Sequence, residues 1–302
     1  MQRKLIQLGN ETFVVSLPSA WLRQHKLKKG DELEVEEVGP KLAIYPSSEL
    51  KLGKVTIDVS GTEPVTKRIL GALYKAGYNE LEIKFESSKE LEIIQQTIRE
   101  SFVGFEILSQ TKQFVIAKNV SGGDYEEFDT LLRRVFLLLI EMGNECFKAL
   151  ASDTPEKLQS VALLDNDINR YVNFCRRTLN SVGHKVVTRI APTYHLVEQL
   201  ERTGDYYRDL CQNISKSRLV PGSLLKDTLA DVNAFVRKFY ELYYKFNFES
   251  LTEFWKEKER LGKSVAQALD VAKKEELHAV FIISQIVESV AGANGALLTA
   301  RL

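Results

Sequence analysis

The segment His195–Ile214, with the sequence HLVEQLERTGDYYRDLCQNI, decides how the long C-terminal part of the chain is interpreted. Its apolar residues recur at spacings of three, four and seven, which is the pattern of an amphipathic helix. They are Val197, Leu200, Tyr207, Leu210, Cys211 and Ile214. The stripe predicts a helix that packs one face into a hydrophobic core.

A band of acidic residues lies beside this stripe. Its members are Glu198, Glu201, Asp205 and Asp209. At roughly 100° per residue they fall on one flank of the helix, with Glu201 and Asp205 one turn apart. Unpaired carboxylates at this spacing repel by a few tenths of a kcal/mol per pair; Arg202 and Arg208 relieve part of that, and a bound cation would relieve more. The pattern fits either a solvated acidic flank or a cation site.

The preceding helical segment offers further oxygen ligands. Asp165 and Asn169 share one flank, one turn apart, and in a three-helix bundle that flank could face Glu201 and Asp205. Oxygen ligands without cysteine suit iron, manganese, magnesium or calcium. Gly204 lies in mid-helix at a cost of ~1 kcal/mol relative to alanine, which predicts close approach of another backbone or a ligand.

The composition indicates a soluble protein of two or three domains. The chain has 302 residues, and Lys plus Arg equals Asp plus Glu at 41 each, so no overall field favours nucleic acid or membrane. Apolar runs such as Val135–Ile140 are too short to span a bilayer, and no signal-peptide pattern opens the chain. Cys146, Cys175 and Cys211 are far apart on helical patterns, as expected of reduced core residues. We expect a cytoplasmic protein that is not integral to the membrane.

Residues 1–52 have the pattern of short strands and turns with an uneven charge distribution. Residues 1–30 hold six basic side chains against Glu11 alone, whereas residues 31–37 hold five acids. A basic face of this kind binds phosphate backbones, although lysines that merely solubilise turns give the same pattern. The residues expected to contact DNA are Arg3, Lys4, Arg23, Lys26 and Lys28. A unit of about 50 residues has too little core to be stable alone, so we expect oligomerisation.

The rest of the chain divides into three parts. Residues 53–120 alternate strand and helix patterns, which predicts a small α/β domain acting as a spacer or ligand sensor. Residues 124–220 and 221–302 each have three amphipathic helical stripes, which predicts two antiparallel three-helix bundles in tandem. In this repeat Glu201 corresponds to Glu288 and Asp205 to Gly292, so the acidic pair is present only in the first copy.

The first segment resembles the AbrB/SpoVT family of swapped-hairpin DNA-binding domains. The turn Gly9-Asn10, the run Ser16-Leu17-Pro18 before Trp21, and the stretch 27–31 (LKKGD) carry the resemblance, which covers residues 1 to about 48. It implies a dimer in which two chains interleave their hairpins into one barrel with a basic face. The family also includes modules that do not bind DNA.

The helical part resembles PhoU proteins. Their third-helix pattern, Glu-Arg-x-Gly-Asp followed by Asn-Ile, is matched by residues 201–205 (ERTGD) together with Asn213 and Ile214. The resemblance implies regulation of phosphate uptake in concert with phosphate transporters, and metal binding through the Glu-x-x-x-Asp motif. An AbrB-like head on a PhoU-like body resembles a class of archaeal phosphate-uptake regulators.

Catalytic motifs are not evident in the sequence. It has no Gly-rich phosphate loop, no nucleophile elbow and no Glu-x-x-His pairs, and His25, His184, His195 and His278 have no partners at catalytic spacing. We therefore expect no enzymatic activity. Three functions remain: a DNA-binding regulator of phosphate uptake and homeostasis, a non-DNA-binding adaptor on a phosphate transporter, and a metal-dependent helical-bundle enzyme.

Overall fold

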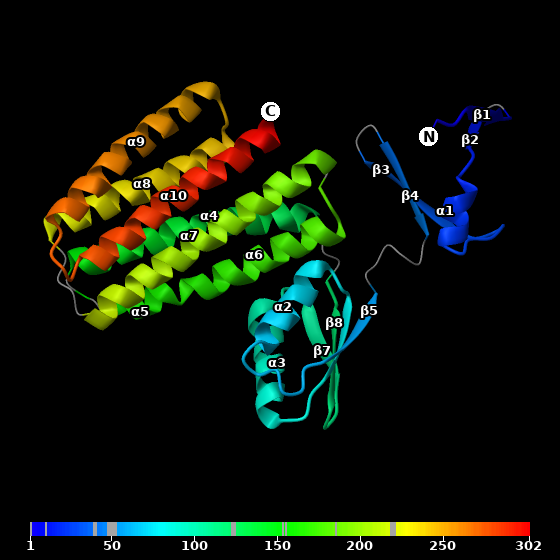
Figure 1. The fold of residues 1–302 in the computed structure, drawn as a ribbon, viewed down its shortest axis with the longest axis horizontal. Helices are drawn as coiled ribbons and strands as arrows, with labels where there is room; N and C mark the ends of the chain where they lie inside the picture. Colours follow the sequence, from blue (N-terminus) through cyan, green and yellow to red (C-terminus); the bar gives the residue numbers. More distant parts are fainter. Residues whose placement is uncertain are drawn as a thin grey trace. The chain divides into compact units, whose positions relative to one another are not determined.

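The computed structural model describes residues 2–9, 11–38, 41–46, 53–121, 125–152, 154, 156–184, 186–217 and 222–302. They form two compact units, Met1–Leu52 and Gly53–Leu302 (Figure 1). The division falls where the sequence placed the end of the first domain. The expected breaks at Gly122-Gly123 and Val220-Pro221 lie outside the described residues.

The N-terminal unit consists of two hairpins and one short helix. Strands β1 (Leu5–Leu8) and β2 (Thr12–Val15) pair antiparallel, with Leu5 opposite Val15. Helix α1 (Ser19–Gln24) follows Pro18, whose fixed φ suits a helix start. Strands β3 (Leu33–Val38) and β4 (Lys41–Pro46) form the second hairpin. The two hairpins are separate two-stranded sheets, so the described residues of one chain do not close the expected barrel.

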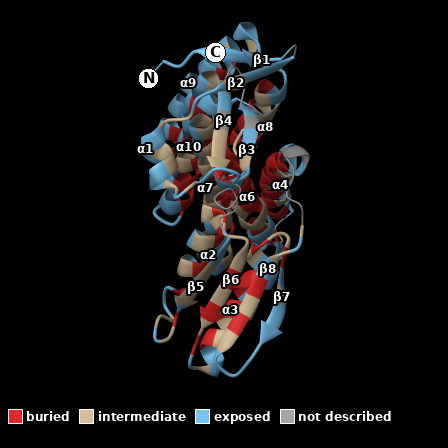
Figure 2. Cartoon of the chain, turned by 90° about the vertical axis from the view of Figure 1, so that its right-hand side faces the viewer, coloured by how far each residue is buried: buried red, intermediate tan, exposed pale blue. Residues whose placement is uncertain are grey.

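Apolar side chains of this unit are largely exposed. Leu5 is 69% exposed, and Phe13, Val35 and Leu42 are each more than half exposed. Figure 2 shows β1 and β2 in the colour of exposed residues. An isolated two-stranded sheet is at best marginally stable in water, because it has no second layer against which to bury its apolar face.

The first part of the second unit is a four-stranded sheet with two helices. Its elements are β5 (Lys54–Asp58), α2 (Thr66–Ala76), β6 (Glu80–Lys84), α3 (Ser88–Ser101), β7 (Phe105–Gln110) and β8 (Phe114–Asn119). The strand order is β5-β6-β8-β7, with β5 and β6 parallel and the other pairs antiparallel. Helices α2 and α3 cover one face of the sheet and share its apolar core (Figure 1). Gly77 ends α2 in the left-handed conformation that glycine adopts readily.

The remainder is helical. The elements are α4 (Tyr125–Ala151), α5 (Lys157–Ala162), α6 (Leu164–Ser181), the 3₁₀ turn η1 (Val187–Arg189), α7 (Ile190–Ser217), α8 (Ser223–Tyr244), α9 (Phe248–Val271) and α10 (Leu277–Arg301). The second helix of the expected first bundle is interrupted at Leu163, a 65% exposed residue between α5 and α6. The apolar stripe of His195–Ile214 is buried along α7, as the sequence predicted.

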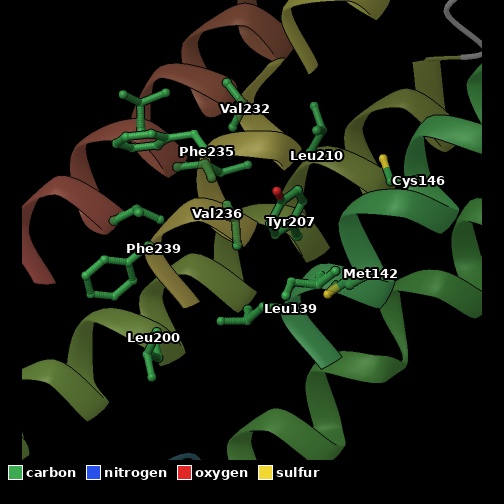
Figure 3. Close-up of a cluster of buried hydrophobic side chains, with 14 of the residues drawn as sticks. Leu139, Met142, Cys146, Leu200, Tyr207, Leu210, Val232, Phe235, Val236 and Phe239 are labelled. Carbon is green, nitrogen blue, oxygen red and sulfur yellow. The ribbon is translucent and has the colours of Figure 1, made fainter. Parts of the chain in front are cut away.

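One continuous hydrophobic core joins these helices. It combines α4, α7 and α8 residues, including Leu139, Tyr207 and Phe235 (Figure 3). Helix α7 packs along α10 more extensively than any other two described elements pack together. The three expected parts, 53–120, 124–220 and 221–302, therefore belong to a single compact unit and do not separate into independent ones. The three cysteines are free and buried in this helical core.

Helix α10 is apolar on nearly all sides. Its length and composition would permit it to cross a membrane, a property that the apolar runs of the sequence did not indicate. In its most apolar stretch 67% of the residues are buried within the protein. The central helix of a soluble bundle has the same apolar character, because other helices surround it.

Candidate nucleic-acid interface and carboxylate cluster

The five basic residues expected to contact DNA are all exposed on the N-terminal unit. Arg3 and Lys4 precede β1, Arg23 lies on α1, and Lys26 and Lys28 follow that helix. None of the five side chains forms a salt bridge with another described residue. Their charges are therefore available to an anionic partner, although no nucleic acid is present to show the contact.

Lys26 has an unusual backbone. Its φ of 54° makes it the one non-glycine residue with positive φ among those described. It follows α1 as in a Schellman motif, with Lys26 N donating to Arg23 O and Leu27 N to Leu22 O. This position usually holds glycine, because a side chain in the left-handed region costs about 1 kcal/mol or more. The chain keeps a lysine there despite that strain.

The acidic residues of α6 and α7 meet around an arginine. Arg208 Nη1 donates to Asp165 Oδ2 at 2.8 Å and also binds Asp205, while its Nη2 donates to Asp209 at 2.9 Å. Asn169 Nδ2 donates to the same Asp165 oxygen at 2.9 Å. The structure thus brings Asp165 and Asn169 onto the flank that faces α7, as the sequence suggested, with Arg208 between the two carboxylates.

A second arginine, which the sequence pattern did not single out, binds the other end of the acidic band. Arg176 of α6 is 2% exposed and lies 2.7 Å from Glu198 and 2.5 Å from Glu201. Arginine suits such a buried position because its rigid fork can bind two carboxylates at once. The band is therefore neutralised by Arg176 and Arg208, not by Arg202.

Burial controls the ionisation of this cluster. Burial raises the pKa of Asp165 to about 6, despite the opposing charge of Arg208. Burial likewise raises the pKa of Asp205, against the same arginine. For Arg208 burial alone would lower the pKa, but hydrogen bonding to Asp209 and the charges of Asp165 and Asp205 outweigh it and raise it. Raised carboxyl pKa values mark sites where charge is incompletely compensated.

The cluster meets some requirements of a metal site but not others. Asp165 Oδ1 is buried and has no hydrogen-bond partner, so one oxygen is available. Within the described residues, however, no three His, Cys, Asp or Glu side chains gather to hold an ion. A metal held by Asp165, Glu201 and Asp205, with Asn169 beside them, would have to displace Arg208 and Arg176.

Gly204 is explained by a neighbouring helix. A Cβ at this position would lie 3.2 Å from both Asp165 Oδ1 and the Ile168 side chain. The close approach predicted from the sequence is therefore that of α6. In the second half of the chain, Glu288 pairs with Lys258 at 3.1 Å, and Gly292 lies against Gln199.

Arg177 links α6 to the α/β part of the unit. It is 5% exposed and donates to the carbonyl oxygens of Tyr74 and Tyr78 and to Asn79 Oδ1, at 2.9, 2.8 and 2.7 Å. The sequence pattern gave no prediction for this residue, because adjacent arginines on a helix usually lie in solvent. A signal was present in the flanking Cys175 and Leu179, which place the pair beside a buried stripe.

Comparisons with known proteins concern the N-terminal unit. Residues 6–51 match the family described as antidote–toxin recognition MazE, bacterial antitoxin. This agrees with the resemblance to AbrB-like swapped-hairpin domains, so the chain carries a domain of this type at its N-terminus. No curated protein and no solved structure matches the chain.

Proposed function

We propose that the chain is a DNA-binding transcriptional regulator of phosphate uptake and homeostasis that acts as a dimer in the cytoplasm. Residues 1–52 form the DNA-binding head, and residues 53–302 form a body that senses a signal or docks on a partner. One observation carries the proposal: five exposed basic side chains, without salt bridges to any described residue, lie on a unit whose residues 6–51 match the MazE family.

Dimerisation follows from the exposed apolar surface of the head. Leu5, Ile6 and Leu8 are each more than half exposed on a four-residue strand. A second copy of the head would cover these side chains and complete a barrel from four hairpins. Two copies would also double the basic charge presented to DNA, which increases affinity by releasing more counterions.

The link to phosphate rests on the resemblance of the helical body to PhoU proteins. The segment 201–205 (ERTGD) lies on α7, where Glu201 and Asp205 face α6. We further propose that Asp165, Glu201 and Asp205, with Asn169 nearby, hold a hard metal ion such as iron, manganese or magnesium. Bound metal would replace Arg176 and Arg208 as the neutralising charge.

Two other functions compete with this one. In the first, the head only dimerises and the body is an adaptor on a phosphate transporter; the exposed basic side chains would then serve solubility. In the second, the carboxylate cluster is the centre of a metal-dependent enzyme. The proposal favours DNA binding because arginines without a carboxylate partner gain little from solvent alone and much from phosphates.

The test is a fluorescence-anisotropy titration of the full chain against duplex DNA between 50 and 200 mM salt. The wild type should lose affinity steeply as salt rises. Arg3→Ala and Arg23→Ala should weaken binding to all sequences alike, and each should reduce the salt slope by about one, because each removes one phosphate-binding side chain. Arg260→Ala, on α9 and paired with Asp231 and Glu257, is the matched control and should leave both unchanged. Equal affinities for all three variants and the wild type would favour the adaptor.

A further inference from the structure

A cavity of about 610 Å³ opens among α4, η1, α7, α8 and α10. Its walls come from the first half of α4, the N-terminal turns of α7, and the C-terminal turns of α8 and α10. This volume falls in the range of small-molecule sites, which is roughly 300–1,000 Å³. The cavity is separate from the carboxylate cluster and shares no residue with it.

Three arginines converge on the cavity without a carboxylate partner. Arg133, Arg189 and Arg301 line it, and none of them forms a salt bridge with a described residue. Asp129 is the one acidic residue among the described lining residues. Three positive charges against one negative charge leave the site electropositive, and such a concave surface concentrates anions.

Two of the arginines are held in place by neutral groups. Arg133 Nε donates to the Tyr240 hydroxyl at 3.3 Å, and Arg301 Nη2 donates to the Tyr243 carbonyl oxygen at 2.7 Å. Each guanidinium keeps further N–H donors, since arginine carries five. The half-buried Arg189 side chain makes no hydrogen bond to any described residue. Its donors are therefore open to a ligand.

The other lining residues complete a site for a polar ligand with an organic part. Thr130 and the buried Thr193 add hydroxyl groups, and Tyr243 and Tyr244 add aromatic surface. Burial raises the pKa of Tyr243 to about 12, so its hydroxyl stays protonated and neutral at physiological pH. The tyrosines thus add no negative charge that would oppose an anion.

We propose that this cavity binds a small phosphate-bearing anion, through Arg189, Arg133 and Arg301. The planar guanidinium fork matches phosphate oxygens and forms paired charge-assisted hydrogen bonds. The volume exceeds that of a lone phosphate ion, which leaves room for an organic group beside the tyrosine rings. The inference goes beyond the proposed function, because it rests on the cavity alone and needs neither DNA nor metal.

Isothermal titration calorimetry on the full chain tests the proposal with three probes. Inorganic phosphate presents the ion alone, AMP presents a phosphate monoester, and adenosine is the uncharged control. We expect saturable binding of phosphate or AMP and at least tenfold weaker binding of adenosine. Tighter binding of AMP identifies the ligand as a phosphate ester, and tighter binding of phosphate identifies the free ion.

The variants Arg189→Gln and Arg301→Gln should each weaken binding at least tenfold. The control Arg260→Gln removes an arginine elsewhere in the body and should bind as the wild type does. Arg189 has no described partner to lose, so its variant should melt at the wild-type temperature and report binding alone. The proposal is overturned if neither phosphate nor AMP binds, if adenosine binds as tightly as AMP, or if both cavity variants bind normally. None of these results changes the DNA titration.

Discussion

Arg177 of α6 donates from Nη1 to the backbone carbonyl oxygen of Tyr74, near the C-terminus of α2, at 2.9 Å. The guanidinium also lies 5.1 Å from the centre of the Tyr74 ring, and Asn180 donates to the next carbonyl, that of Lys75, at 2.7 Å. The last carbonyls of a helix lack intrahelical partners and carry the negative end of its dipole. A buried arginine therefore satisfies α2 and fixes the α/β part to the helical core.

Arg177→Ala should destabilise the second unit by about 3 kcal/mol or more, because buried carbonyl oxygens lose charged donors. Urea unfolding followed by circular dichroism should show a lower midpoint, or a separate early transition of the α/β part. Arg134→Ala is the control, since this exposed residue makes only a 3.9 Å ion pair with Glu141. Indistinguishable curves for Arg177→Ala and the control would show that the contact does not hold the two parts together.

Lys26→Gly should separate stability from binding in the head. Glycine adopts the left-handed backbone without strain, so the variant should be about 1 kcal/mol more stable. It should nevertheless bind DNA more weakly, because the ammonium group that binds a phosphate is removed. Thermal melting and the anisotropy titration measure the two effects on the same sample. Stronger or unchanged DNA binding would remove Lys26 from the interface.

Asp165→Asn should make the protein more stable at neutral pH. The folded-state pKa of Asp165, about 6, lies above the usual value of 3.8, so ionisation destabilises the fold as pH rises from about 4 to 6. A difference of about two units corresponds to about 3 kcal/mol above pH 6. Urea unfolding at pH 4 and pH 7.5 should show little difference between variant and wild type at the lower pH and a large one at the higher. A wild type more stable than the variant at pH 7.5 would contradict this account.

Iron or manganese should raise the melting temperature of chelator-stripped protein. A ligand that binds only the folded state adds about 2.7 kcal/mol at a hundredfold excess over its dissociation constant. The rise should vanish in Glu201→Gln and Asp205→Asn and persist in Glu288→Gln. Removing a competing charge in Arg208→Gln should enlarge it. A melting temperature indifferent to every divalent ion would leave the cluster as a set of ion pairs.

The periodic part of the fold was predictable, whereas the contacts between elements were not. The α7 stripe repeats every three or four residues, so Leu200, Tyr207 and Leu210 could be placed in the core from the sequence. The break at Leu163 had no such signal, because the apolar spacing continues across it. Hairpin patterns predicted strands in residues 1–46, but pairing between hairpins depends on a second chain.

The candidate sites show the same division. Spacing placed Asp165 and Asn169 on one flank, and the structure joins them by a hydrogen bond. Spacing did not reveal that Arg176 and Arg208 bind the acidic band, because each arginine side chain can turn toward several neighbours. The arginine-lined cavity draws Arg133, Arg189 and Arg301 from distant segments, so only the folded chain brings them together.

The central claim is that two heads pair to form the DNA-binding surface, and light scattering tests it most directly. The mass of the full chain is measured at micromolar concentration, alone and with a short duplex DNA. We predict about twice the chain mass of 34.3 kDa without DNA, and two chains per duplex in the complex. A particle of 34.3 kDa that stays monomeric, with or without DNA, would contradict the claim.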